Sequence, residues 1–191
     1  MKKFILSSAV SMVLLSSCTT FNRKMIKNDL SVIKKENAFN IDGRYEFKGY
    51  EHIDAANKKS EEAGDIARMF DIKNINVENC DQLVIKSVPM EKKNTYELQF
   101  TFLKESKTKY SFKYSAVLKN DFFILDNYTS FCHGIPYLFG GCRSFQSRIG
   151  LTRDHHLVIQ DYYDNSGAAL FVMGAGYTIN YAEKYKRISN E

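Results

Sequence analysis

The chain has 191 residues, with 27 basic against 22 acidic side chains and a formal net charge of +5. So small and dispersed an excess of positive charge does not predict nucleic-acid binding. The 12 tyrosines and 14 phenylalanines supply a large apolar area, and only two prolines and ten glycines interrupt it. This composition excludes a disordered chain and predicts one folded domain with a substantial core.

The N-terminal segment predicts an export leader. Met1-Lys2-Lys3 precedes a largely apolar run over residues 4–15, which is shorter than the roughly 20 residues of a transmembrane helix. The run ends in Leu15-Ser16-Ser17-Cys18, an aliphatic residue followed by two small residues and a cysteine. This arrangement resembles the bacterial lipoprotein signal. The alternative is an ordinary secretory leader with a cysteine nearby by chance.

The resemblance implies that residues 1–17 are removed and that Cys18 is the lipid-attachment residue. Acyl chains on Cys18 would hold the protein on a membrane, since each buried methylene contributes about 0.8 kcal/mol. In some bacteria, an acidic cluster directly after the lipidated cysteine resembles a signal for export to the cell surface. No such cluster follows Cys18. We therefore expect a lipid-anchored protein of the bacterial cell envelope, in the outer membrane and facing the periplasm.

Residues 18–41 are predicted to form the lipidated N-terminus and a tether. Its basic side chains, between Arg23 and Lys35, are placed to contact anionic lipid headgroups. Ile26, Leu30 and Ile33 fall at i, i+4 and i+7, which puts them on one face of a short helix. We expect a solvated spacer with a few helical turns.

Strand patterns begin at residue 42. Tyr45 and Phe47 alternate with polar residues, which is typical of a half-buried strand. Residues 55–70 contain good helix formers with an apolar end and predict one helix. Residues 83–88 resume the strand pattern, and Pro89 predicts its end.

The most regular alternation in the chain lies between residues 96 and 114. Apolar residues occupy alternate positions on either side of the charged segment 104–109, which predicts a hairpin with one buried face. We expect this face to be close-packed, with a small cavity at one end. Five of its aromatic residues are the ligand-binding candidates if the interior is open: Tyr96, Phe100, Phe102, Phe112 and Tyr114.

Residues 117–124 predict a second hairpin, with a polar turn at its centre. Strands are expected over residues 147–151 and 157–162, and the sequence Asp-Asn-Ser-Gly at 164–167 predicts a turn before the next strand, 168–173. Residues 177–185 predict the last strand. Gly174-Ala175-Gly176 predicts a bend or bulge just before it.

Together these elements predict a mostly β, antiparallel fold of eight to ten short strands, with one inserted helix after the first strand. Gly43-Arg44-Tyr45 followed by successive hairpins resembles the lipocalin family, with tyrosine at the usual tryptophan position. The resemblance implies an antiparallel barrel, and residues 42–191 form a single domain. A two-sheet β-sandwich is the alternative.

The remaining cysteines predict one disulfide. Cys132 and Cys142 are close in sequence, and an exported protein meets an oxidising compartment, so we expect them to be bridged. Cys80 is then a buried free thiol, although its pairing with either partner is an alternative. A zinc site from Cys132, His133 and Cys142 lacks the clustered spacing of structural zinc sites. No metal site is therefore predicted.

The sequence predicts neither a catalytic constellation nor a cofactor. His155 and His156 are adjacent, so on a strand they would point to opposite faces. Asp154, Asp161 and Asp164 lie beside residues typical of turns, where aspartate is common, so no catalytic role is needed to account for them. The glycines near residue 175 lack a following phosphate-binding helix.

Two classes of function follow from these patterns. The first is a non-enzymatic envelope lipoprotein that binds an apolar small ligand or an envelope protein partner. The second is an envelope enzyme of unknown reaction that uses His133, or His155 with Asp161. A histidine in a cleft with a carboxylate in hydrogen-bond reach would favour the enzyme.

Overall fold

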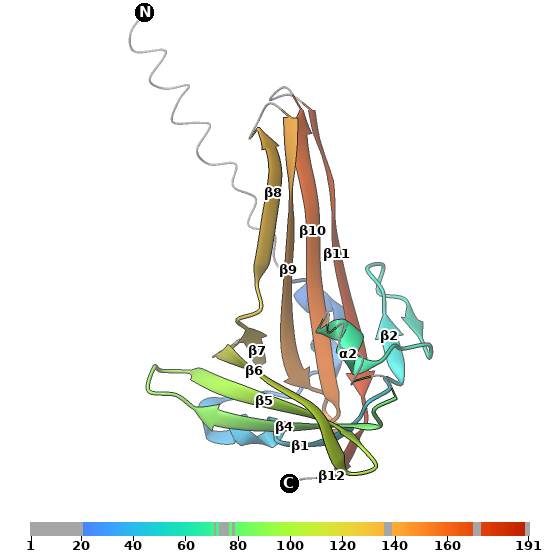
Figure 1. Ribbon diagram of the computed structural model, residues 1–191, viewed down its shortest axis with the longest axis vertical. Coiled ribbons are helices and arrows are strands. Elements are labelled where there is room, and N and C mark those ends of the chain that lie inside the picture. The colour runs from blue at the N-terminus through green and yellow to red at the C-terminus, as the bar shows by residue number, and fades with distance from the viewer. Residues whose placement is uncertain are drawn as a thin grey trace, which may run out of the picture.

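The computed structural model describes residues 21–70, 72, 77, 79–135, 139–169 and 173–189, so Cys18 and the leader lie outside the described residues. Twelve strands form one antiparallel sheet in this part of the chain (Figure 1). They are β1 (Gly43–Glu46), β2 (Glu51–Ile53), β3 (Lys59–Ser60), β4 (Gln82–Pro89), β5 (Thr95–Lys104), β6 (Lys107–Lys119), β7 (Phe122–Leu125), β8 (Thr129–Ile135), β9 (Phe139–Leu151), β10 (Leu157–Ala169), β11 (Met173–Tyr185) and β12 (Arg187–Ser189). Short helical segments accompany them: η2 (Arg23–Met25), η3 (Lys27–Asp29), η4 (Lys35–Ile41) and α2 (Ile66–Met69).

The sheet curls until its two ends approach each other. Its strand order is β12-β1-β4-β5-β6-β7-β9-β10-β11-β2-β3, with β8 paired to β9. Only Lys186 separates β11 from β12, although these strands lie near opposite ends of that order. The amide of Glu46 donates to the carbonyl of Lys186 at 2.8 Å, next to the junction. The resulting half-barrel confirms the predicted mostly β, antiparallel fold, and its single sheet differs from the sandwich alternative.

Three strands of 13 residues extend beyond the half-barrel. β9, β10 and β11 pair along their full lengths, and β8 pairs with the distal half of β9. Figure 1 shows these strands rising together above the curled base of β1 and β4–β7. We call the distal part, residues 129–135, 139–145, 163–169 and 173–179, the arm.

The length of these strands shows that the predicted turn at residues 164–167 and the predicted bend or bulge at residues 174–176 are wrong. Residues 164–167 lie inside β10, and residues 174–176 lie inside β11. Residues 164–167 pair with β9 on one side and with β11 on the other. Because each backbone group finds a partner in these ladders, pairing overrides the local turn preference of Asp, Asn, Ser and Gly.

The core lies on the concave face of the sheet. Tyr96, Phe100 and Phe102 of β5 are buried, as predicted, and β5 pairs with β6 in a hairpin that sets Phe100 opposite Phe112. The rings of Phe100 and Phe112 are nearly parallel, with centroids 4.9 Å apart. Phe70, which follows α2, closes over the pair, with its centroid 5.0 Å from that of Phe100. The candidate aromatic residues are therefore packed in or against the core.

The predicted helix over residues 55–70 forms only at its end, as α2. The carboxylate of Asp54 accepts hydrogen bonds from the amides of Ala56 and Lys58, at 2.8 and 2.9 Å. Asn57 has a φ of 61°, which lets the chain turn back so that β3 pairs with β2. The side chain of Asp54 and the β2 ladder satisfy backbone groups that a helix would otherwise pair, so helix propensity is overridden.

The described part of the predicted tether packs against the sheet. Met25 and Ile26 join a small apolar cluster, while Ile33 and Ile41 are buried in the main core. The amide of Ser31 donates to the carbonyl of Leu151 at 2.8 Å, which ties the segment to β9. Residues 22–41 are therefore part of the folded unit and not the solvated spacer that was expected, although they do form a few helical turns, of the 3₁₀ type.

Candidate functional site

Side chains on one face of the arm lie in rows. Neighbouring strands pair residue against residue, and alternate residues of a strand share a face. On the face that continues the concave side of the sheet, the row nearest the core contains Thr129, Phe145, Tyr163 and Ile179. The next row contains Phe131, Arg143, Asn165 and Tyr177.

The third row contains a cleft because its two central residues lack side chains. Gly141 pairs with Gly167, and His133 flanks this pair on β8. The cleft has a volume of about 590 Å³. This volume lies within the range of small-molecule binding sites. A Cβ atom added to Gly141 would lie 3.1 Å from the carbonyl oxygen of Ser166, so any larger residue would crowd the floor.

Polar groups converge on this glycine floor. Arg143, Asn165 and Tyr177 line one side of the cleft, and His133 lines it from β8. The amide nitrogen of Asn165 donates to the hydroxyl of Tyr177 at 3.4 Å, which holds the two side chains together. The exposed Arg143 forms no ion pair with any residue that the structure describes. Among its described lining residues, the cleft contains hydrogen-bond donors and no carboxylate.

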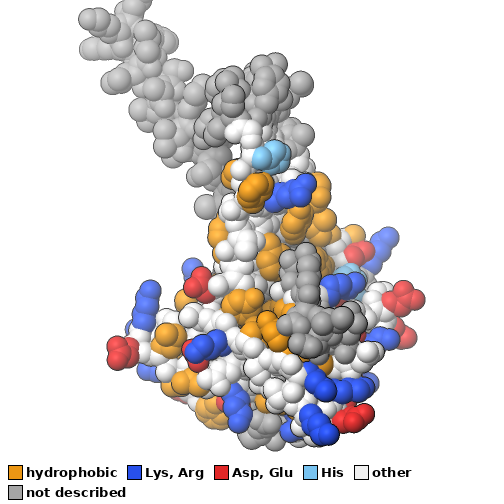
Figure 2. All heavy atoms as spheres, viewed as in Figure 1, with side chains coloured by type: hydrophobic (Ala, Val, Ile, Leu, Met, Phe, Trp, Pro, Cys, Tyr) orange, Lys and Arg blue, Asp and Glu red, His pale blue; other side chains and the backbone are white. Residues whose placement is uncertain are grey.

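Aromatic side chains beside the cleft are exposed to solvent. Phe131 is 69% exposed and Tyr177 is 52% exposed, although both are large and apolar. Each of them contacts a neighbouring ring only loosely. The ring centroids of Phe131 and His133 lie 6.4 Å apart, and those of Tyr177 and Tyr163 lie 6.2 Å apart. Figure 2 shows hydrophobic, basic and histidine side chains exposed together along the arm. Such a concentration of exposed aromatic side chains is typical of a binding surface.

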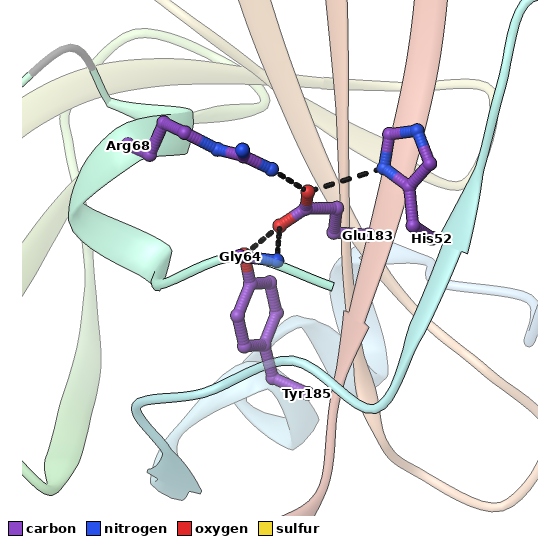
Figure 3. Close-up of polar contacts among 5 residues, drawn as sticks. All are labelled: His52, Gly64, Arg68, Glu183 and Tyr185. Carbon is purple, nitrogen blue, oxygen red and sulfur yellow. Dashed lines mark hydrogen bonds and ion pairs between the residues drawn. The ribbon is translucent and has the colours of Figure 1, made fainter. Parts of the chain in front are cut away.

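A second polar group lies buried at the base of the arm. Glu183 of β11 is fully buried, and four groups surround its carboxylate (Figure 3). Nη2 of Arg68 and Nδ1 of His52 lie 2.5 and 3.1 Å from Oε1. The amide of Gly64 and the hydroxyl of Tyr185 donate to Oε2 at 3.2 and 2.7 Å. Burial and the adjacent carboxylate raise the pKa of Tyr185 well above its usual value, so its hydroxyl remains a donor.

Glu183 fastens the segment between β1 and β4 to the sheet. His52 comes from β2, while Gly64 and Arg68 lie just before and within α2. The carboxylate therefore joins three separate pieces of backbone at a position closed to solvent. Because charge-assisted hydrogen bonds already surround both oxygens, we interpret Glu183 as a structural residue.

Asp161 of β10 is also fully buried, on the same face of the sheet as Glu183. Neither carboxylate oxygen forms a hydrogen bond of regular geometry. Burial raises the pKa of Asp161 to about 8; the nearby hydroxyls of Ser147 and Tyr181 lower it, and the charge of Glu183 raises it further. Asp161 is therefore largely protonated at neutral pH in the folded protein.

Two acids in unlike environments can serve as an acid–base pair in catalysis. Asp161 and Glu183 are both 0% exposed, however, and neither lines the cleft on the arm. A substrate would have to displace packed side chains to reach them. The arrangement therefore supports a structural role for both carboxyl groups.

The predicted disulfide between Cys132 and Cys142 is confirmed. It joins directly paired residues of β8 and β9, so these cysteines belong to a hairpin and not to an irregular loop. Cys80 is buried and takes no part in a disulfide, as expected. Burial raises its pKa, which keeps the thiol protonated and unreactive.

The disulfide is expected to hold β8 on the arm. Among the residues that the structure describes, β8 pairs only with β9, and none of its residues belongs to either core cluster. Replacing both Cys132 and Cys142 with serine should therefore speed amide hydrogen exchange in residues 129–135 by at least about tenfold. Exchange in β5, at the centre of the core, is the internal control. Unchanged protection in β8 would contradict this assignment.

The structure brings only one of the histidines considered from sequence to the cleft. His133 lines it, but His155 lies in the exposed turn between β9 and β10, with a φ of 62°. Asp161 is six residues further along the chain and buried, so His155 and Asp161 form no pair. Asp164 lies on the other face of β10, where it accepts hydrogen bonds from Ser166 and Thr178.

Sequence reasoning missed Arg143, Asn165 and Tyr177 as cleft residues. The predicted turn at residues 164–167 concealed the length of β10 and hence the pairing that aligns these three side chains. Alternation through residues 139–147 of β9, with Arg143 between Gly141 and Phe145, is the signal that indicates this face. The glycine pair is recognisable only once the register is known.

Within the described residues, no three His, Cys, Asp or Glu side chains are grouped so as to hold a metal ion. No family model matches this sequence, and comparisons with curated proteins and with solved structures found no similar protein.

Proposed function

We propose that this protein is a lipid-anchored protein of the bacterial cell envelope that binds a ligand or protein partner through its arm and catalyses no reaction. The observation that carries the binding role is the exposed aromatic face of the arm beside the glycine-floored cleft. A monomeric fold has no structural need for a single-layer arm with Phe131 and Tyr177 in solvent.

The packing of the base supports binding at the arm. Tyr96, Phe100 and Phe102 are buried in the core, and Phe112 and Tyr114 are half-buried against it. None of these five residues lines the cleft. An apolar ligand is therefore better accommodated on the arm than inside the half-barrel.

The proposed location rests on the sequence that ends at Cys18. No helix among the described residues is long and apolar enough to cross a membrane. The leader supports attachment to a membrane through acyl chains on Cys18. We propose that this membrane is the outer membrane and that the protein lies on its periplasmic face.

Replacing Cys18 with serine should abolish lipid attachment. Growth with labelled palmitate should mark the wild-type protein, while the Cys18→Ser variant should carry at least about tenfold less label and leave the detergent phase, because serine lacks the thiol that receives the diacylglyceryl group. Cys80→Ser is the matched control and should label normally. A fully labelled Cys18→Ser protein would disprove the anchor.

Native mass spectrometry of protein purified from its own membrane tests the binding role. We expect the acylated protein together with a retained ligand or partner. When Phe131 and Tyr177 are both replaced by serine, the protein should keep its acyl chains and lose the ligand or partner. A retained species that persists in this double variant would place binding away from the arm.

An envelope enzyme that uses His133 is the second candidate. His133 lines the cleft, which favours it over His155. No carboxylate is among the described residues that line the cleft, so His133 there lacks the acidic partner that orients a catalytic histidine. We therefore favour the binding role.

A further inference from the structure

We propose that the cleft on the arm binds the anionic headgroup of an amphiphile whose apolar chain lies on the aromatic rows beside it. The inference rests on the proposed binding role of the arm and names the chemistry of its ligand. It is carried by the register of β8–β11, which places a guanidinium, an amide, a phenol and an imidazole around a floor without side chains.

The groups around the floor select an anion. Arg143 supplies a permanent positive charge and a fork of donors that suits a phosphate or carboxylate. Asn165 and His133 can add further donors, and the hydroxyl of Tyr177 lies in hydrogen-bond contact with Asn165. A neutral ligand would leave the guanidinium of Arg143 without a counter-charge in the cleft.

The acidic residues of β8–β11 are Asp161, Asp164 and Glu183, and none of them neutralises this site. Glu183 is buried at the base and bonded to Arg68 and His52. Asp164 projects from the opposite face, where its carboxylate already accepts hydrogen bonds from Ser166 and Thr178. On the cleft face, Asp161 is four residues from Asn165 along β10, or about 13 Å at the rise of a strand. It is buried, and burial raises its pKa so that it remains largely uncharged at neutral pH.

The rows beside the cleft select an apolar chain. Phe131 and Tyr177 flank Arg143 and Asn165 in the second row, and Ile179 lies in the row below, 36% exposed. Tyr163, in the same row as Ile179, contacts the ring of Tyr177. A ligand with its charged group on the glycine floor could therefore extend its chain toward the base along the side chains of Tyr177, Tyr163 and Ile179.

The glycine floor explains why the headgroup would enter at this row. Any side chain at Gly141 would project into the cleft, since its Cβ would already lie 3.5 Å from Cε1 of His133. With hydrogen at Gly141 and Gly167, a phosphate-sized group can approach the backbone between His133 and Arg143. The arrangement thus combines close backbone approach with a cationic side chain.

Titration calorimetry with dodecyl phosphate, below its micelle concentration, tests the proposal. The full-length Cys18→Ser chain serves as the protein, so that no detergent is needed that could compete for the cleft. We expect saturable binding of dodecyl phosphate, at least tenfold weaker binding by Arg143→Gln, and similar weakening by Gly141→Ala. Arg153→Gln removes the same charge from the exposed turn at the other end of β9 and should bind as the parent does.

Two further probes separate the parts of the ligand. Dodecanol retains the chain without the charge, and inorganic phosphate retains the charge without the chain; both should bind at least tenfold more weakly than dodecyl phosphate. Equal binding of dodecanol, or undiminished binding by Arg143→Gln, would overturn the anionic site. Equal binding of inorganic phosphate would overturn the amphiphile. Palmitate labelling at Cys18 and partner retention on the arm are separate readouts, so this proposal can fail while the proposed function stands.

Discussion

The Asp161→Asn variant is expected to be more stable than the wild-type protein at pH 8, with an advantage that shrinks as the pH falls toward 4. Burial raises the pKa of Asp161 to about 8 from its ordinary 3.8, so the folded state holds a proton that the unfolded state releases. Between these values the unfolded state binds fewer protons, and wild-type stability therefore declines as the pH rises. The decline contributed by Asp161 can reach about 1.4 kcal/mol per pH unit.

Urea unfolding at pH 5, 6, 7 and 8 measures this effect. Asparagine keeps the shape of the side chain but cannot ionise, so the difference in unfolding free energy between variant and wild type should increase by about 2 kcal/mol or more over this range. Asp154→Asn, in the exposed turn before β10, is the control and should follow the wild-type profile. Parallel profiles for Asp161→Asn and wild type would show that Asp161 ionises normally in the folded protein.

Truncating Phe100 to alanine is expected to destabilise the protein by about 3 to 5 kcal/mol. Phe100 is 0% exposed, and its ring contacts those of Phe70 and Phe112 at centroid distances of 5.0 and 4.9 Å. Removing the ring leaves a cavity that the paired strands β5 and β6 cannot close, because their register fixes the backbone. The midpoint and slope of chemical unfolding give the free energy.

Phe39→Ala is the matched control for this prediction. Phe39 lies in η4 and is 64% exposed, so its truncation should change the unfolding free energy by less than about 0.5 kcal/mol. A cost below about 1 kcal/mol at Phe100 would instead indicate an open interior. The aromatic face of β5 and β6 would then be a candidate ligand-binding site.

Local periodicity predicted the elements whose strands meet neighbours close in sequence. The hairpin of β5 and β6 follows from alternation at Tyr96, Phe100 and Phe112, since a period of two with one apolar face has only one favourable register. The hairpin of β6 and β7 is confirmed as well. Its turn residues Asn120 and Asp121 have φ of 54° and 68°, values that their side chains tolerate.

Elements whose tertiary pairing outweighs their local composition were mispredicted or missed. Residues 164–167 have turn composition, but β9 and β11 pair with them on both sides and extend the strand. The helix expected over residues 55–70 is reduced to α2, because Asp54 caps a turn and Glu183, more than 110 residues away, binds Gly64 and Arg68. Local propensities of about 1 kcal/mol or less per residue give way to such pairing.

The sequence by itself determined the β class, the aromatic core face of β5 and β6 and the Cys132–Cys142 disulfide, because alternation and close spacing act over short stretches of chain. Only the tertiary structure decided the arm and its cleft. The cleft exists because the register of β9 and β10 sets Gly141 beside Gly167 and aligns Arg143 with Asn165. That register is set by the buried residues that β9 and β10 pair near the base, and it aligns the arm residues because both strands continue unbroken beyond the core.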